Sequence, residues 1–239
     1  MKADARALSQ ALALCLSQDT ECDARPLDGG WQLSCMSPDG VTLCDVRVKR
    51  EAFPKGVDGT PEEFVVDTDR WLKALRTVGP TAEVEFIDGR VRLSGRGLRH
   101  TFRLAEVRDR RNKFRMPDLS ARMTAQCMVE TERLRTLLSS VDTKKVDELR
   151  VVIRPEGLMV TAYDDALDGA DLTVPPEECA ILTGQASAAF PAEAWMDLMR
   201  ASSADVVQID LGDDVPAMAE FGDTAYDCRW LCAPRIQQG

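Results

Sequence analysis

Apolar residues recur along this chain with two different periods, one typical of helices and the other typical of strands. Four segments place apolar residues three or four positions apart, which predicts amphipathic helices. We expect these helices at about 3–17, 68–78, 131–141 and around Trp195. Between them, short segments alternate apolar and polar residues, as at Val84 and Phe86 and again at Ile209 and Leu211, which predicts half-buried strands. The pattern therefore favours an α+β fold with few helices and many short strands.

The same order of predicted elements occurs twice along the chain. The segments around the helix that contains Trp71 match those around the helix that contains Trp195, 124 residues further along. Each of these helices is followed by a strand, an acidic turn and another strand, which in the second copy begins at Val215. Upstream, a strand, an acidic turn and a strand start at Gly30 and again at Gly157. The chain is therefore predicted to hold two copies of one structural plan.

A polar segment separates the two copies. It contains few strand-forming residues and is broken by Pro117. We expect an N-terminal domain at 1–107, a connector at 108–120 and a C-terminal domain at 121–239. Phe114, Met116 and Leu119 are apolar residues on this connector, and they must either cover a neighbouring surface or be offered to a partner.

Length and composition are those of an ordinary globular protein. The chain has 239 residues, of which 44% are apolar and 29% are charged, as in proteins that bury one large core or two smaller ones. No apolar run approaches the ~18–20 residues that a membrane-spanning helix needs, so no membrane partner is expected. The segment ALALCL near the N-terminus has polar neighbours and no small-residue cleavage site, and we interpret it as part of an amphipathic helix.

Residues that carry chemistry do not converge on a catalytic or metal site. The eight cysteines include no Cys-x-x-Cys pair, which argues against a zinc ribbon or a thioredoxin-type motif and favours reduced, buried thiols. The single histidine, His100, lies in a strand-like stretch without an evident nucleophile and is expected to be structural. We therefore expect no enzymatic activity, no cofactor and no metal.

Three segments of the chain are similar to segments of a known family. They are residues 34–46 (SCMSPDGVTLCDV), 214–221 (DVPAMAEF) and 231–236 (LCAPRI), of which the last is the most specific. With these segments the chain resembles the proliferating cell nuclear antigen (PCNA) family of sliding DNA clamps, in its archaeal form, over nearly its whole length. The resemblance implies the DNA clamp fold, in which each subunit has two similar α+β domains, each with two helices packed on antiparallel sheets. It also implies that three subunits assemble into a ring.

The resemblance implies a function as well. The chain is expected to be a DNA polymerase sliding clamp, a processivity factor that encircles duplex DNA and docks replication and repair enzymes. Its expected partners are double-stranded DNA, DNA polymerase, the clamp loader, flap endonuclease, DNA ligase and further copies of the same chain. It would be cytoplasmic and nucleoid-associated in an archaeon, and nuclear in a eukaryote. The alternative is a checkpoint-type or other clamp-like scaffold subunit of a mixed ring, without a peptide-binding pocket.

In this family, a short helical peptide of the client enzymes, the PIP-box motif, enters a pocket on the clamp. The C-terminal strand end, the interdomain connector and the loop after the second strand form this pocket. An apolar concavity suits such a helix-in-groove anchor, although each matching residue taken alone is also compatible with ordinary packing. By position, the pocket is expected to use Met36, Gly40, Val41, Leu43, Phe114, Met116, Pro117, Pro216, Leu231, Ala233, Pro234 and Ile236.

The net charge of −10 does not by itself suit a DNA-binding protein, which normally presents a basic surface. On the helix at 68–78, however, Trp71, Leu75 and Val78 form an apolar stripe and cations recur on the opposite side. The resemblance places these cations on helices that line the hole of the ring, whereas the alternative is a solvated helix face. The expected DNA-facing residues are Arg70, Lys73, Arg76, Arg133 and Arg200. Because acidic residues interrupt the other helices, direct affinity for DNA is expected to be weak.

Charge is distributed unevenly along the chain. Residues 90–115 hold ten Arg or Lys and two acids, whereas residues 163–174 hold four aspartates and no cation. By the resemblance, the strands at about 99–106 and 166–174 are exposed edges that meet head to tail between subunits. The subunit interface is expected to use Arg99, Thr101, Arg103, Asp168, Ala170, Asp171 and Leu172. The sequence leaves open whether the ring is homotrimeric or mixed, and whether the basic connector attracts acidic clients or is a solvated loop.

Overall fold

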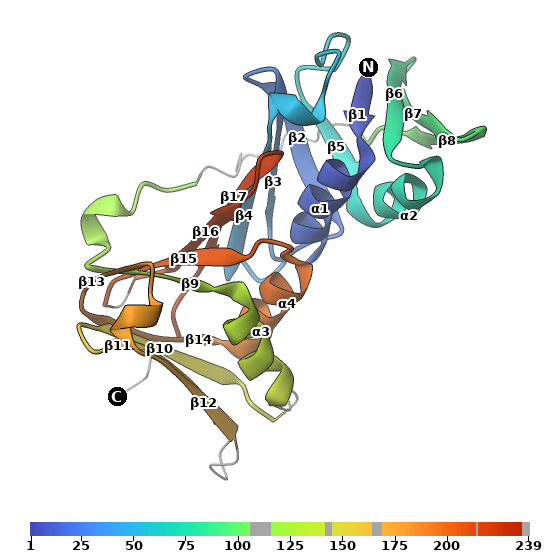
Figure 1. Ribbon diagram of the computed structural model, residues 1–239. Helices are drawn as coiled ribbons and strands as arrows, with labels where there is room; N and C mark the ends of the chain where they lie inside the picture. Colours follow the sequence, from blue (N-terminus) through green and yellow to red (C-terminus); the bar gives the residue numbers. More distant parts are fainter. Residues whose placement is uncertain (106–115, 142–144, 164–168, 214, 236–239) are drawn as a thin grey trace. The chain divides into compact units, whose positions relative to one another are not determined.

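The chain folds into two compact units, which are described separately below (Figure 1). The computed structural model describes residues 1–105, 116–141, 145–163, 169–213 and 215–235. The first unit comprises Met1–Met116 and Gly222–Cys228, and the second comprises Pro117–Phe221 and Arg229–Gly239. Both combine helices with antiparallel strands, which confirms the expected α+β class.

The structure bears on two further expectations, the domain boundaries and the lack of a membrane-spanning helix. The boundaries proposed for the two domains and the connector stay a prediction, because residues 106–115 lie outside the described part of the chain. Met116 and Leu119, at the described end of that connector, are half-buried. Where residues are described, no helix is both long enough and apolar enough to cross a membrane.

The first unit contains two helices in its described part, α1 (Ala5–Leu16) and α2 (Thr68–Val78). One antiparallel sheet has the strand order β1 (Lys2–Asp4), β6 (Thr81–Ile87), β7 (Arg90–Gly95) and β8 (Leu98–Arg103). Four further antiparallel strands lie in the order β4 (Thr42–Val48), β3 (Gly30–Met36), β2 (Glu21–Leu27) and β5 (Phe64–Asp67). A short 3-10 helix, η1 (Arg50–Ala52), follows β4.

The second unit contains α3 (Thr131–Ser140) and α4 (Ala192–Ala201) in its described part. One antiparallel sheet has the strand order β12 (Gly169–Val174), β11 (Gly157–Tyr163), β10 (Glu148–Arg154) and β14 (Ala186–Pro191). The other strands lie in the order β13 (Ile181–Gly184), β9 (Ala125–Glu130), β15 (Val206–Leu211) and β16 (Ala217–Gly222). The residues of β17 (Tyr226–Cys232) are divided between the two units, and η2 (Ser120–Arg122) and η3 (Pro176–Glu178) are short 3-10 helices.

The two helices of the first unit begin at aspartate caps. The carboxylate of Asp4 accepts hydrogen bonds from the backbone N–H groups of Arg6 (2.8 Å) and Ala7 (3.0 Å). The carboxylate of Asp67 accepts one from the N–H group of Arg70 (3.0 Å). Such caps satisfy backbone donors that have no partner inside the helix. The two capping aspartates therefore set where α1 and α2 start.

The predicted internal repeat is present in the structure. Trp71 is the fourth residue of α2 and Trp195 is the fourth residue of α4, and both side chains are buried. Gly30 begins β3 and Gly157 begins β11, and a Cβ atom at either glycine would collide with the carbonyl oxygen of a valine that ends the neighbouring strand. Equivalent positions in the two units thus obey the same packing constraint.

One predicted strand boundary is wrong. The strand expected to begin at Val215 begins at Ala217, as β16. Pro216 lies directly before it, and a proline has no backbone N–H group with which to join the ladder. Val215 is nonetheless buried, so its apolar character reflects packing in the core and not membership of the strand.

Aromatic side chains fill the core of each unit. In the first unit, Trp31 lies 5.0 Å from Phe53 and 6.0 Å from Trp71, measured between ring centroids. In the second unit, Trp195 lies 5.9 Å from Phe190 and 5.2 Å from Trp230. Tilted and edge-to-face arrangements at such distances are favourable for aromatic rings. Each unit therefore has a tryptophan-centred core of its own.

All eight cysteines are free thiols, as expected, and seven of them are buried. Cys35 on β3 lies directly opposite Cys44 on β4, and the sulfur of Cys44 is 3.8 Å from that of Cys228. The thiol of Cys35 also contacts the carbonyl oxygen of Cys15 on α1 at 3.6 Å. Contacts with the thiols of Cys22, Cys35 and Cys44, in that order, raise the pKa of Cys15 well above its ordinary value, and burial adds to the effect. The first unit therefore holds a cluster of buried, protonated thiols.

Candidate functional site

The residues of the expected peptide pocket fall into two groups, one in each unit. In the first unit, Met36 and Leu43 lie directly opposite each other at the ends of β3 and β4. The tight loop between them turns at Gly40, whose φ of +73° is one that glycine adopts without strain. Met36, Val41 and Leu43 are half-buried and Gly40 is exposed. The loop therefore presents apolar side chains from a defined backbone.

Hydrogen bonds from Asp39 hold this loop in place. Its carboxylate accepts from the hydroxyl of Ser37 (2.5 Å) and from the backbone N–H of Val41 (3.1 Å). These two hydrogen bonds, the one from Ser37 first, lower the pKa of Asp39. The N–H of Gly40 donates to the carbonyl oxygen of Ser37 (2.8 Å). The loop is therefore held in its conformation by its own polar groups.

In the second unit, Leu231 lies in β17, Pro216 lies just before β16, and Ala233 and Pro234 lie just after β17. Leu231 is buried, with 5% of its surface exposed, whereas Pro216, Ala233 and Pro234 are half-buried. Just beyond them, the N–H of Arg235 donates to the carbonyl oxygen of Ala189 on β14 (2.8 Å), which fixes the tail after β17.

The structure brings together only part of the predicted pocket. Met36 and Leu43 are placed side by side, Met116 is half-buried and Pro117 is exposed. Phe114 and Ile236 lie outside the described residues. The pocket as a whole therefore stays a prediction.

The helix α2 carries the cations that were expected to face DNA. Arg70, Lys73 and Arg76 are exposed, while Trp71 and Leu75 on the other side are buried, as the sequence predicted. Arg70 pairs with Asp67 at 3.2 Å and Lys73 pairs with Asp69 at 2.7 Å, whereas Arg76 has no ion-pair partner among the described residues. Exposed pairs of this kind are weak, so Arg70 and Lys73 are held only loosely by their aspartates.

The other two expected DNA-facing arginines differ from each other, because Arg133 is tightly engaged and Arg200 is not. Arg133 on α3 is half-buried and pairs with Glu130 (3.4 Å) and Glu178. Arg200 on α4 is exposed and lies 3.9 Å from Asp197. Partial burial, reinforced by repulsion from Glu193, raises the pKa of Asp197. The second unit therefore offers less free positive charge on its helices than the first.

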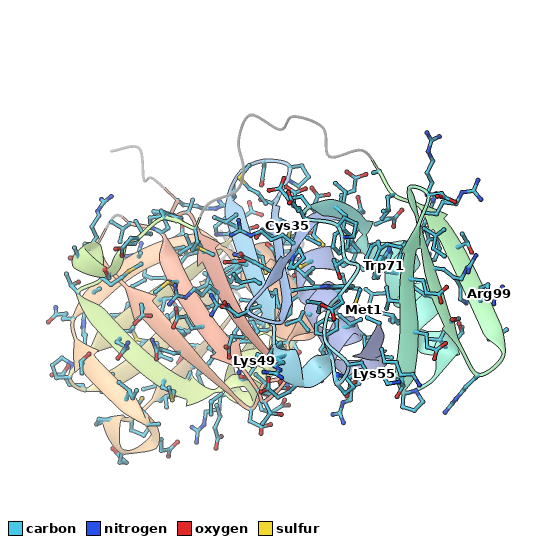
Figure 2. The ribbon with its side chains drawn as sticks, turned by 90° about the horizontal axis from the view of Figure 1, so that it is seen from above. Met1, Cys35, Lys49, Lys55, Trp71 and Arg99 are labelled. Carbon is cyan, nitrogen blue, oxygen red and sulfur yellow. The ribbon has the colours of Figure 1, made fainter. Side chains whose placement is uncertain are left out.

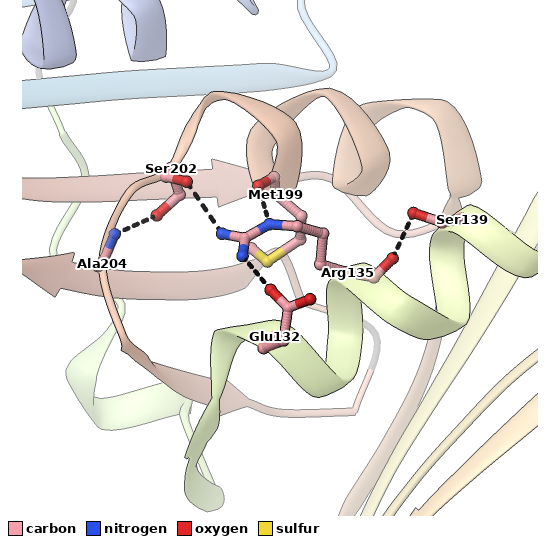
Figure 3. Close-up of polar contacts among 6 residues, drawn as sticks. All are labelled: Glu132, Arg135, Ser139, Met199, Ser202 and Ala204. Atoms are coloured by element: carbon pink, nitrogen blue, oxygen red, sulfur yellow. Dashed lines mark hydrogen bonds and ion pairs between the residues drawn. The ribbon is translucent and has the colours of Figure 1, made fainter.

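A third arginine of the second unit has a role that sequence reasoning missed. Arg135 on α3 donates from Nε to the carbonyl oxygen of Met199 (3.2 Å) and from Nη2 to that of Ser202 (3.0 Å), and it pairs with Glu132 (Figure 3). The two carbonyl groups belong to the end of α4, where backbone acceptors lack partners within the helix. Arg135 therefore caps α4 from the neighbouring helix. No sequence signal distinguishes it from Arg133, two positions earlier.

The strand expected at one subunit edge, β8, is the edge strand of its sheet. Its pairing with β7 is continuous from Arg103 to Leu98, so no bulge interrupts the alternation at His100. Arg99, Thr101 and Arg103 are exposed, whereas His100 is half-buried on the other side. The His100 ring lies 2.8 Å from the hydroxyl of Thr77, measured from Nε2, which fits the structural role expected for this residue.

The strand expected at the other edge, β12, is also the edge strand of its sheet. Asp171 is exposed, and Ala170 and Leu172 are half-buried. The hydroxyl of Tyr163 donates to the Asp171 carboxylate (2.8 Å), and this hydrogen bond raises the pKa of Tyr163. Asp168 lies outside the described residues. Pairing of the two edges between subunits stays a prediction.

Comparison with known proteins gives matches over almost the whole chain, although no family model matches. The chain is 24% identical over 225 residues to proteins named DNA polymerase sliding clamp from two strains of Methanococcus maripaludis, C6 and S2, covering 88% of this chain and of each relative. It superposes on A. fulgidus PCNA bound to the C-terminal region of FEN-1 with a TM-score of 0.88 at 17% identity, covering 100% of this chain and 98% of that one.

Two further solved structures give the same result. The Entamoeba histolytica protein named Proliferating Cellular Nuclear Antigen matches with a TM-score of 0.84 at 16% identity, covering 98% of both chains. PCNA from Thermococcus kodakaraensis matches with a TM-score of 0.81 at 21% identity, covering 98% of this chain and 99% of that one. The chain therefore has the DNA clamp fold. Within that class, the resemblance to the PCNA family that the sequence indicated is confirmed.

Proposed function

We propose that this chain is a DNA polymerase sliding clamp that encircles duplex DNA and holds replication and repair enzymes on it. One observation carries the proposal: relatives named DNA polymerase sliding clamp match along 88% of both chains. The fold supports it, because it superposes on a PCNA structure over 100% of this chain. The compartment depends on the organism that the chain comes from. The clamp acts at the nucleoid in an archaeon and in the nucleus in a eukaryote. The chain acts as a scaffold and carries out no chemistry of its own.

The charges of the helices are consistent with a clamp that stays on DNA because its ring is closed, and not because it binds phosphates strongly. Three exposed cations on α2 supply loose phosphate contacts, whereas Arg133 is held by two glutamates. A closed ring needs no strong phosphate binding, because the duplex cannot leave it sideways. The exposed edge strands β8 and β12, one basic and one carrying Asp171, support a head-to-tail ring of identical copies.

The decisive experiment is a comparison of closed and cut DNA. The chain is loaded on a nicked plasmid by its clamp loader, separated from free protein by gel filtration in about 0.5 M salt, and the plasmid is then linearised. A sliding clamp stays with the circle and leaves the linear product, because salt screens phosphate contacts but does not open a ring. Equal retention on both forms, or retention on neither, contradicts the proposal.

Client docking is tested separately with a peptide that carries the Gln-x-x-aliphatic-x-x-aromatic-aromatic motif. The double variant Met116→Asp/Pro234→Asp should bind it at least about tenfold more weakly, because a charge enters an apolar groove. Met159→Asp is the matched control, since Met159 is an exposed methionine of β11, outside the proposed pocket. If calorimetry shows equal affinities for the double variant and the control, the pocket is elsewhere.

A further inference from the structure

The solvent-facing side of β7 and β8 in the first unit carries a concentration of arginines. In the register of these strands, Arg90 lies directly opposite Arg103, Arg92 opposite Thr101, and Ser94 opposite Arg99. Arg90, Arg99 and Arg103 are exposed. Figure 2 shows Arg99 on the outermost strand of the sheet. Four guanidinium groups therefore share one face of two neighbouring strands.

Most of this charge is not neutralised by the residues that the structure describes. Arg92 pairs with Glu85 on β6 at 3.0 Å, but Arg90, Arg99 and Arg103 have no ion-pair partner among the described residues. The direct Arg90–Arg103 pair is unfavourable, because like charges opposite each other in a sheet repel. A bound anion between the two side chains would relieve that repulsion.

The same face is hollowed beside the arginines. A concavity of about 370 Å³ is lined by Ile87, Asp88, Arg90, Arg92 and Thr101. The Nε atom of Arg92 is buried and has no hydrogen-bond partner among the described residues. Asp88 is the one carboxylate among the lining residues, so the lining has an excess of hydrogen-bond donors. The hollow is therefore shaped and charged for an acidic group.

Two kinds of macromolecule present acidic groups at regular intervals, and this face suits one of them better. Single-stranded nucleic acid is normally held by aromatic stacking beside the basic groups, but the aromatic residues of β8, His100 and Phe102, alternate with the exposed arginines and so lie on the other side of the sheet. Ile87, an aliphatic residue with 45% of its surface exposed, lies beside the arginines instead. An aliphatic patch beside cations favours a peptide.

Spacing also fits a peptide. Arg90 and Arg92 are two residues apart on β7, about 6.6–6.8 Å, and Arg99 and Arg103 are four apart on β8, about 13 Å. Side chains at positions i, i+2 and i+4 of an extended peptide have the same spacings. We propose that the solvent face of β7 and β8 docks an extended segment of a partner protein that carries acidic residues at alternate positions and one aliphatic residue. The acidic residues face Arg90, Arg99 and Arg103, and the aliphatic one covers Ile87.

This surface is distinct from the client pocket and from the helices proposed to face DNA. It shares Arg99 and Arg103 with the proposed subunit edge, but Arg90 and Arg92 belong to it alone, because they lie on β7, one strand in from the edge strand β8. Its test therefore centres on Arg90, and its failure would leave the sliding-clamp proposal untouched.

The test measures fluorescence anisotropy of a labelled peptide with glutamates at alternate positions and one isoleucine, in about 50 mM salt. Arg90→Gln should weaken binding about fivefold and Arg90→Glu more strongly, since each exposed charge pair contributes up to about that factor. Arg154→Gln is the matched control, because Arg154 is an exposed strand arginine of the second unit. Arg90→Glu should also raise the unfolding temperature by pairing with Arg103, so lost binding cannot be ascribed to unfolding.

Three outcomes overturn the proposal. One is equal binding by the parent, Arg90→Gln and the Arg154→Gln control. Another is tighter, Arg90-dependent binding of a single-stranded oligonucleotide of equal charge, which would assign the face to nucleic acid. The third is a change of sedimentation in Arg90→Gln, which would assign the face to a second copy of the chain.

Discussion

The two units of this chain share an order of elements, but they differ in what their surfaces do with charge. In the first unit, α2 presents three exposed cations, and the face of β7 and β8 adds three arginines that have no ion-pair partner in the described part of the chain. In the second, Arg133 is held by two glutamates and Arg135 is used to cap α4. The comparison teaches that duplication preserves the packing plan, while the polar positions remain free to diverge.

The cores of the two units also differ in the number of cysteine thiols that they contain. The first unit gathers five thiols, Cys15, Cys22, Cys35, Cys44 and Cys228, beside a tryptophan-centred aromatic cluster. The second has three thiols, of which Cys127 and Cys179 are 3.6 Å apart. Because a free cysteine packs like a small hydrophobe, both solutions satisfy the same apolar pattern.

The largest expected effect tests whether the matched tryptophans are equivalent. Trp71→Ala and Trp195→Ala should each lower the free energy of unfolding by about 3–5 kcal/mol, because each removes a buried aromatic ring and leaves a cavity. Urea unfolding followed by circular dichroism measures both, with exposed Arg70→Ala as the control. A cost for Trp195→Ala below half that for Trp71→Ala would break the equivalence of the two units.

The next effect concerns the matched glycines. Gly30→Ala and Gly157→Ala should each cost about 1–3 kcal/mol, because the added methyl group collides with the carbonyl oxygen of Val48 or Val174. At Gly157 the φ of +134° adds backbone strain to the collision. Gly56→Ala is a useful control, since its φ of +75° brings backbone strain while nothing lies within 4 Å of the added atom. If either matched variant melts like the parent in calorimetry, that strand start is not held by close backbone approach.

A smaller effect separates the arginines of the second unit. Arg135→Gln should lower the free energy of unfolding by about 1–2 kcal/mol, because the carbonyl groups of Met199 and Ser202 lose their partner. Arg200→Gln should leave stability nearly unchanged, since the exposed pair with Asp197 is weak. Chemical denaturation of both variants checks this, and equal losses would show that Arg135 is an ordinary surface cation.

The smallest effect follows from the thiols and depends on pH. The contact with Cys15 lowers the pKa of Cys44, but the contact with Cys228 and burial raise it, to about 11 overall. An unfolded thiol has its pKa near 9.0, so the unfolded state loses its proton first. The stability that this thiol contributes is therefore complete below pH 9 and is lost as pH rises towards 11.

Between pH 8 and pH 10 the loss should be about 1 kcal/mol for such a thiol. Cys44→Ala should remove that part of the pH dependence, as measured by urea midpoints at the two pH values. In the second unit, burial and then the contact with Cys179 raise the pKa of Cys127 to about 12, so Cys127→Ala is the matched comparison. If the urea midpoint of either variant falls between the two pH values as steeply as the parent's, the thiol that was removed is not a source of the pH dependence.

Several elements of the fold could be predicted because their signals are local. The helix expected at 68–78 is α2, Thr68–Val78, since its apolar stripe and the Asp67 cap lie within one segment. The strand start at Val215 was wrong because an apolar residue before a proline packs in the core without joining the ladder. Of the candidate site, the sequence predicted the exposure of Arg70, Lys73 and Arg76. It did not predict the ion pairs of Arg133 with two glutamates.

By itself, the sequence determined the periodicity of the elements, their duplication and the resemblance to a clamp family, because these depend on residues close together in the chain. Tertiary structure alone decided which polar groups meet. Arg135 reaches Ser202, 67 positions away, and Arg90 faces Arg103 only through the pairing of β7 with β8. Hydrogen bonds and ion pairs act over a few ångströms, so a linear order of residues does not reveal them until the chain has folded.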